Sequence, residues 1–144
     1  MDRVFSIMII QKALYLFMRT HFAPQLFVPS PTFDISFYTI GLGAVELRRF
    51  SNDDKSIHVS ELSIDGCVFH LHEAKPSAGQ LDPKQVGSNS VLIGLFVDDV
   101  DALMKRAVAA GATVTHEAQD YDYGYRQGEF RDPFGHLWLI EKKI

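Results

Sequence analysis

The sequence predicts an α+β fold built from two similar βαβββ modules, and two observations support this prediction. The predicted elements run strand–helix–strand–strand–strand, then a segment rich in Pro, Gly, Ser and Gln over 76–89, and then the same order again. Glycines recur at nearly constant offsets: Gly43 and Gly111 are 68 positions apart, and Gly66 and Gly135 are 69 apart. Such offsets are typical of a tandem repeat.

This repeat also predicts the domain organisation. We expect one domain over 21–144, with a first module at 21–75, a linker at 76–89 and a second module at 90–144. A sheet that carries a helix on one face needs cover for its other face. We therefore expect the two modules to form a curved mixed sheet around a shared cleft, with the helices on the outside.

Composition narrows the class of protein. The chain has 144 residues, of which 47% are hydrophobic and 12% aromatic, enough for a globular core. Its net charge of −4 provides no basic stripe for nucleic acid. The single cysteine, Cys67, excludes an internal disulfide and favours the cytoplasm. Its neighbours Val68 and Phe69 predict a buried, inert thiol.

Residues 1–20 differ from the rest of the chain. Their apolar run is broken by Gln11 and Lys12, so it is too short to cross a membrane. No small-residue cleavage site follows, which argues against a signal peptide. Two alternatives remain: a leader helix that docks on the domain or on a partner subunit, or an extension that is not native to the fold, with translation starting at Met18.

The first module is predicted from local signals. Thr32 is expected to cap a helix at 33–40, with Phe33, Phe37 and Ile40 on its apolar face. Before it, Pro29-Ser30-Pro31 ends the first strand. The expected strands are 22–28, 44–50, 56–64 and 67–73, with turns at 51–54 and at Asp65-Gly66.

The second module follows the same order. A helix from 100 to 110 is expected to be capped by Asp98 or Asp99. The residues expected to form its apolar stripe are Val100, Leu103, Met104 and Ala107. Asp132-Pro133-Phe134-Gly135 has the composition of a turn, because Pro presets φ and Gly closes the turn. The expected strands are 90–97, 112–116, 125–130 and 136–140.

Three segments carry a family resemblance. They are PQLFVPSPTFDISFYTIGLGAVELRR in the first half, and LFVDDVDALMKRAVAAGATV and YGYRQGEFRDPFGHLWLI in the second. Together they resemble the vicinal oxygen chelate superfamily, which includes glyoxalase I, bleomycin-resistance proteins and extradiol dioxygenases. They are most similar to an uncharacterised glyoxalase-like group ending in DPFGHxW. The resemblance implies paired βαβββ modules and a homodimer.

Enzymes of this superfamily hold a divalent metal with one side chain from the first and last strand of each module. Carried over by position, the resemblance implies Ala23, His70, Leu92 and Leu139. Only His70 can bind a metal, so we expect no metal cofactor and keep His70 as a weak candidate. A shift of two residues gives Gln25, His72, Gly94 and Glu141. If the first and last strands are antiparallel, as we expect, that shift separates each pair by about 13 Å.

Further polar residues lie near the predicted site. Arg126 either binds a carboxylate or phosphate or pairs with Glu129 or a nearby Asp. Tyr123 is placed to reach a ligand. His58 is expected to be satisfied by its neighbours, and Trp138 to pack beneath a helix, on the strand face opposite Leu139. Glu141 is expected to be exposed, since it is near the C-terminus.

These observations predict a glyoxalase- or bleomycin-resistance-like protein that binds a small molecule without the family metal. The alternative is a glyoxalase-like lyase or isomerase, or a dioxygenase relative, whose atypical site uses His70, Gln25 and Arg126, so enzymatic activity stays open. The expected partners are a small molecule and a second copy of the chain, with neither nucleic acid nor membrane. The predicted substrate-binding residues are Gln25, His70, His72, Leu92, Gly94, Tyr123, Arg126, Leu139 and Glu141.

Overall fold

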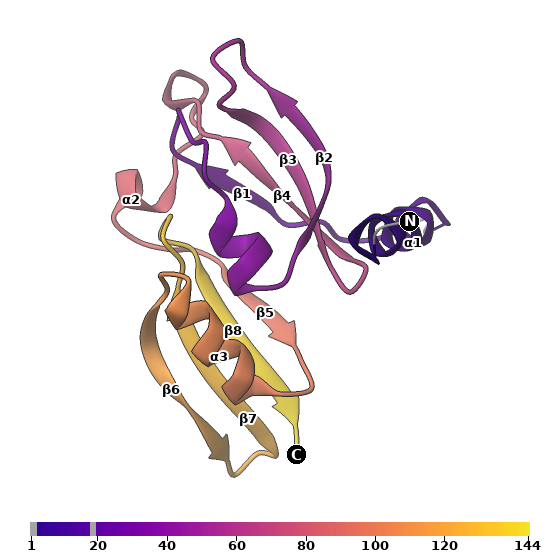
Figure 1. The fold of residues 1–144 in the computed structure, drawn as a ribbon. Helices are drawn as coiled ribbons and strands as arrows, with labels where there is room; N and C mark the ends of the chain where they lie inside the picture. Colours follow the sequence, from indigo (N-terminus) through magenta and orange to yellow (C-terminus); the bar gives the residue numbers. More distant parts are fainter. Residues whose placement is uncertain (1–2, 18–19) are drawn as a thin grey trace. The chain divides into compact units, whose positions relative to one another are not determined.

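The computed structural model describes residues 3–17 and 20–144, and it contains two four-stranded mixed sheets with few helices (Figure 1). The predicted α+β class is therefore confirmed. The chain divides into two compact units. The first combines the residues up to Phe33 with Gly43–Leu81, and the second combines Asp34–Leu42 with Asp82–Ile144. The short helix expected in the first module thus belongs to the second unit.

The first sheet has the strand order β1-β4-β3-β2. Its strands are β1 (Gln25–Val28), β2 (Val45–Ser51), β3 (Ile57–Ile64) and β4 (Cys67–Glu73). The pairs β2–β3 and β3–β4 are antiparallel, whereas β1 and β4 are parallel. The expected antiparallel arrangement of first and last strands is wrong. Two hairpins reverse the chain twice between β2 and β4, so β4 runs in the same direction as β2. The crossover connection from β1 makes β2 parallel to β1, and β4 is therefore parallel to β1 as well.

The second sheet repeats this arrangement in the order β5-β8-β7-β6, with β5 and β8 parallel. Its strands are β5 (Leu92–Phe96), β6 (Thr113–Tyr121), β7 (Tyr125–Arg131) and β8 (Leu137–Lys143). β6 continues well beyond the predicted 112–116. Because β1 and β4 are parallel, as are β5 and β8, moving the candidate site residues two positions along each strand moves both members of a pair in the same direction. The 13 Å separation argued from antiparallel strands therefore does not apply.

Helix α3 (Val100–Ala109) lies across one face of the second sheet (Figure 1). Asp99 caps it, since the Asp99 carboxylate accepts a hydrogen bond from Ala102 N at 2.9 Å. Its buried side chains are Val100, Leu103, Met104 and Ala107, the predicted apolar stripe. In β7, Gly128 leaves room for this helix, because a Cβ there would lie 3.0 Å from the Met104 methyl group. The sheet face that carries Gly128 is therefore the core face.

The helix predicted at 33–40 is reduced to a single π-helical turn, η1 (Phe37–Gly41). Thr32 does not cap it, because the Thr32 hydroxyl donates to Pro29 O and Ser36 occupies the N-cap position. Phe33 and Ile40 are exposed rather than buried. The Asp34 carboxylate holds Ser36 N at 2.8 Å in a local turn, which delays the start of the helix.

A buried carboxylate organises the core of the second unit. Asp132 Oδ2 accepts hydrogen bonds from the Tyr38 hydroxyl at 2.7 Å and from Trp138 Nε1 at 3.0 Å. Its Oδ1 accepts from the backbone N–H groups of Phe134 and His136 at 2.9 and 3.0 Å. Four donors thus fix the predicted turn and join η1 to it. Trp138 is buried on the α3 side of the sheet, as predicted.

The leader forms helix α1 (Arg3–Phe17), and many of its apolar side chains are exposed, including Ile10, Leu16 and Phe17. The start site proposed at Met18 lies outside the described residues. None of the described helices is long and apolar enough to cross a membrane. The predicted linker contains two short helices, η2 (Pro76–Ala78) and α2 (Pro83–Val86).

Cys67 is exposed, so the prediction of a buried thiol is wrong. It is the first residue of β4, directly after the Asp65-Gly66 turn. Its neighbours Val68 and Phe69 are buried within the strand, but the end of the hairpin leaves the thiol at the surface.

Candidate functional site

Each sheet has one apolar core face and one face on which polar and aromatic side chains remain partly accessible, which we term its open face. On the first sheet the open face includes a row formed by Phe27, His72 and Val59 on neighbouring strands. The matching row on the second sheet is Phe96, Glu141 and Gln127. The adjacent rows are Gln25–His70–Glu61 and Gly94–Leu139–Glu129.

A hydrogen-bonded chain crosses the open face of the second sheet. The Tyr123 hydroxyl donates to Gln127 Oε1, and Gln127 Nε2 donates to Glu141 Oε1 at 2.9 Å. Glu141 is 8% exposed, so the expectation that it is exposed is wrong. Residue Gly94 borders the second carboxylate oxygen, since a Cβ built there would lie 3.0 Å from Glu141 Oε2. A glycine at this position therefore leaves room beside that oxygen.

Aromatic rings form a row beside this chain. Tyr121 stacks on Tyr123 with ring centroids 5.1 Å apart, and Tyr123 lies 5.8 Å from Tyr125. Tyr125 in turn lies 6.2 Å from Phe96. Partial desolvation raises the pKa of the Tyr123 hydroxyl, and the nearby Tyr121, Asp122 and Glu141 raise it further. Tyr123 therefore stays protonated at neutral pH and acts as a hydrogen-bond donor to Gln127.

On the first sheet, His70 lies between Gln25 on β1 and Glu61 on β3. Its Nε2 atom is buried and has no hydrogen-bond partner among the described residues. Burial lowers the pKa of His70, partly offset by the charge of Glu61, while His72 lowers it further. The imidazole is therefore mainly neutral at pH 7, and the described residues leave one of its nitrogens without a hydrogen-bond partner.

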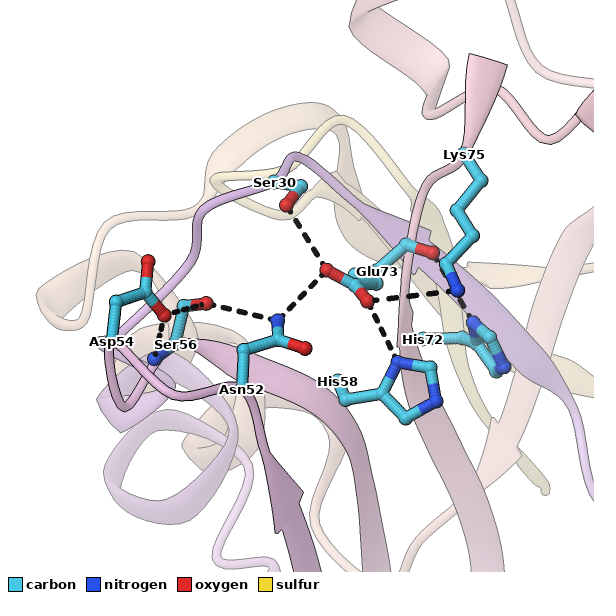
Figure 2. A network of polar contacts seen from close by, with 8 residues as sticks. All are labelled: Ser30, Asn52, Asp54, Ser56, His58, His72, Glu73 and Lys75. Atoms are coloured by element: carbon cyan, nitrogen blue, oxygen red, sulfur yellow. Dashed lines mark hydrogen bonds and ion pairs between the residues drawn. The ribbon is translucent and has the colours of Figure 1, made fainter. Parts of the chain in front are cut away.

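A separate polar network lies at the end of this sheet (Figure 2). Glu73 Oε1 accepts a hydrogen bond from His58 Nδ1 at 2.7 Å, and Oε2 accepts from Ser30 Oγ and Asn52 Nδ2, both at 3.0 Å. The His58 contact is the main cause that lowers the pKa of Glu73, against the opposing effect of burial. His58 is thus satisfied by a neighbour, as expected.

Arg126 projects toward α3, away from the open face. Its Nε and Nη2 atoms each lie 2.7 Å from an oxygen of Asp101, and its Nη1 lies 2.8 Å from Asp120 Oδ1. The ion-pair alternative is therefore the arrangement in the structure, although with Asp101 and Asp120 instead of Glu129. These partners occupy the fork that would otherwise bind an anionic ligand.

The structure thus brings together subsets of the predicted residues. Gln25, His70 and His72 share the open face of the first sheet, while the open face of the second carries Leu92, Gly94, Leu139 and Glu141, with Tyr123 in the hairpin that borders it. The predicted set of substrate-binding residues does not include Gln127, Phe96 or Tyr125. The alternation of Tyr125, Gln127 and Glu129 could have found Gln127, because alternate residues share a face.

The comparisons with known proteins agree with this architecture. A family model for the glyoxalase/bleomycin resistance protein/dioxygenase superfamily matches residues 20–140. The chain belongs to this superfamily. An uncharacterised protein of Mycobacterium bovis is 35% identical over 125 residues, which cover 85% of this chain and 82% of that protein. A Mycobacterium tuberculosis protein, also uncharacterised, has the same identity and is covered over 74% of its length.

Solved structures of the superfamily fold are also similar. A gene product of Arabidopsis thaliana has a TM-score of 0.68 at 25% identity, covering 87% of this chain and all of that one. TioX from Micromonospora has a TM-score of 0.65 at 23% identity, with 86% and 100% covered. The fosfomycin resistance protein of Listeria monocytogenes, in complex with Mn(II) and sulfate, has a TM-score of 0.65 at 16% identity, with 89% and 93% covered.

The side chains at the superfamily's four metal positions do not fit a metal in this chain. Alanine and leucine side chains occupy three of them, and only His70 has a donor atom. Within residues 3–17 and 20–144, no three His, Cys, Asp or Glu side chains are grouped closely enough to hold an ion. The homodimer, the cytoplasmic location and the cleft between the modules stay predictions.

Proposed function

We propose that this protein binds a small organic cation on the open face of the second sheet. Glu141 is the observation that carries the proposal. Glu141 as a whole residue is 8% exposed; its Oε1 accepts a hydrogen bond from Gln127, and its Oε2 borders Gly94. A carboxylate that is largely removed from water attracts a protonated amine more strongly than an exposed carboxylate does.

The aromatic row supplies the second part of the proposed site. The ring centroid of Tyr125 lies 5.8 Å from that of Tyr123 and 6.2 Å from that of Phe96, so the row offers ring faces and edges to a flat apolar group. Electron-rich faces of tyrosine also attract cations. A ligand with an aromatic ring and an amine would satisfy both features, and such binding agrees with a superfamily that includes bleomycin resistance proteins.

Matched ligands test this proposal. Phenethylamine and 3-phenylpropionic acid have similar size but opposite charge, and isothermal titration calorimetry compares their affinities for the purified full chain. We expect the amine to bind at least about tenfold more tightly than the acid, since an unpaired anion beside Glu141 is repelled. The variant Glu141→Gln should remove this preference, because it keeps the size of the side chain and loses its charge.

Glu117→Gln is the matched control, because Glu117 is an exposed carboxylate on β6. It should leave the amine preference unchanged. Equal binding of amine and acid, or an amine preference that survives Glu141→Gln, would reject the proposed cation site.

His70 supports a second candidate function, a lyase or isomerase that removes a proton next to a carbonyl group. A neutral imidazole whose Nε2 has no hydrogen-bond partner in the described part of the chain is suited to act as a general base. Proton–deuterium exchange at the carbon of dihydroxyacetone, followed by NMR, tests it. Exchange that is catalysed by the wild-type protein and lost in His70→Ala would favour the enzyme, whereas equal exchange in both would exclude His70 as the base.

A further inference from the structure

We infer that His58 and His72 form a binding site for a transition-metal ion in the first unit, apart from the organic-cation site proposed above. Neither the family's four metal positions nor the predicted substrate-binding set includes His58. Glu73 makes a hydrogen bond to each of the two rings (Figure 2). Those hydrogen bonds determine which nitrogen of each neutral ring remains available to a metal.

Glu73 fixes the same tautomer in both histidines. Its carboxylate accepts from His58 Nδ1 at 2.7 Å, and its backbone carbonyl oxygen accepts from His72 Nδ1 at 3.2 Å. A carbonyl oxygen only accepts hydrogen bonds, and so does an ionised carboxylate, so each Nδ1 carries the proton in the neutral ring. Each Nε2 then has a free lone pair. This arrangement, in which an oxygen orients the nitrogen opposite the ligating one, is typical of metal-binding histidines.

The two rings are also close enough to share an ion. Their centroids lie 5.5 Å apart with an interplanar angle of 64°. A metal–nitrogen bond of about 2.0–2.1 Å places the ion about 3.2 Å from each ring centre, so two coordinated imidazoles have centres about 5–6 Å apart. The rings lie on the adjacent strands β3 and β4, which hold this spacing. Phe27 packs edge-on against His72 at 5.9 Å and limits the rotation of that ring.

The residues around His58 and His72 determine which kind of metal ion binds and how readily it exchanges with solvent. The His58 side chain is 38% exposed, so an ion can approach from solvent. The described residues supply no third His, Cys, Asp or Glu donor, and water would complete the coordination sphere. Two imidazoles favour Cu²⁺, Ni²⁺ and Zn²⁺ over Mg²⁺ or Ca²⁺. The ammonium group of Lys75 lies 4.0 Å from Glu73 Oε1, and its side chain is half-exposed, so solvent screens its charge. The expected site therefore binds an exchangeable ion.

Metal titration of the untagged full chain tests the inference. Ni²⁺ is added at pH 7.5 and binding is followed by calorimetry, with Mg²⁺ as the negative control. We expect one Ni²⁺ per chain, and a loss of affinity of about tenfold or more in His58→Ala and in His72→Ala. Glu73→Gln should weaken binding by about tenfold, because such outer partners typically contribute 10- to 100-fold to metal affinity.

His116→Ala is the matched control. His116 is also a strand histidine whose Nδ1 faces a carboxylate, at 3.3 Å from Glu129 Oε1, but it is not paired with another imidazole among the described ring contacts. Its replacement should leave Ni²⁺ binding unchanged. If a histidine variant fails to fold, paramagnetic broadening of the His58 and His72 imidazole signals in the wild-type protein decides instead. Absent Ni²⁺ binding, or binding unaffected by both histidine substitutions, would overturn the inference.

Discussion

The two sheets have the same strand order and the same pairing, yet their open faces carry different chemistry. Where the first sheet has His72 opposite Phe27, the second has Glu141 opposite Phe96. One row away, His70 corresponds to Leu139 and Gln25 corresponds to Gly94. Both sheets therefore have a phenylalanine on the first strand of the row. The two imidazoles of the first sheet are replaced in the second by the carboxylate of Glu141 and the side chain of Leu139.

This difference shows that the pairing of the strands and the chemistry of the open face are determined by different residues of the sequence. Strand pairing depends on the alternation of apolar and polar residues and on the turns between strands, and both halves retain these features. The open-face side chains lie on the side of each sheet opposite its apolar core face, so their chemistry differs between the halves while the strand pairing stays the same. The ligand sites proposed for the two halves therefore differ in kind, with imidazole nitrogen donors in the first and an acidic aromatic surface in the second.

The largest expected difference between the two units is in stability, at the hairpins that precede β4 and β8. In the second unit, Asp132→Ala removes the acceptor of four hydrogen bonds and leaves the buried Tyr38 hydroxyl and Trp138 N–H without it. We expect the free energy of unfolding to fall by about 3–5 kcal/mol. Urea unfolding followed by circular dichroism measures this change.

In the first unit, the side chain before the turn is Ser63, which accepts one hydrogen bond from Gly66 N at 3.0 Å. Ser63→Ala should therefore reduce the free energy of unfolding by only about 1 kcal/mol. Equal losses in the two variants would show that Asp132 does not have the organising role assigned to it, and that the two hairpins contribute alike.

The sequence predicted the parts of this fold that depend on local pattern. The hairpin glycines, the Asp99 cap and the apolar stripe of α3 were all identified from spacing, and the structure contains them. The turn at Asp132 was predicted too. Its contact with Tyr38 was not, because those residues are 94 positions apart and no local pattern connects them.

The errors have a common physical cause. The helix at 33–40 was predicted from apolar spacing, but the Asp34 turn and tertiary packing of Tyr38 determine where η1 begins. The relative direction of β1 and β4 depends on a crossover, which strand periodicity does not encode. The network around Glu73 joins two loops to a strand end, through Ser30 and Asn52, and no spacing rule connects such segments.

Glu73 provides the next prediction, because its pKa makes the first unit sensitive to acid. His58, Asn52 and Ser30 lower the pKa of Glu73 below its usual value of 4.5. Its stabilising contribution is therefore complete above the unfolded-state pKa and is lost as pH falls through the lower folded-state pKa. At pH 7, we expect Glu73→Gln to reduce the free energy of unfolding by about 1–2 kcal/mol.

Urea unfolding of both proteins between pH 7 and pH 3 measures this dependence. The difference between wild type and Glu73→Gln should shrink as the pH falls below about 4.5, since protonation removes the same charge from the wild-type protein. Glu117→Gln, at an exposed site, should show almost no difference at any pH. A Glu73→Gln deficit that is constant with pH would contradict the role of the ionised carboxylate.

The smallest expected effect is a change in amine affinity. It compares substitutions at equivalent positions on the open faces of the two sheets. In Gly94→Ala the new methyl group would lie 3.0 Å from Glu141 Oε2 and partly cover it. We expect phenethylamine affinity to fall by about fivefold, or about 1 kcal/mol, with the free energy of unfolding changed by less than about 0.5 kcal/mol. Gln25→Ala, at the corresponding position of the first sheet, should leave amine affinity unchanged. Calorimetry with all three proteins decides, and equal weakening in both variants would mean that the amine does not discriminate between the two faces.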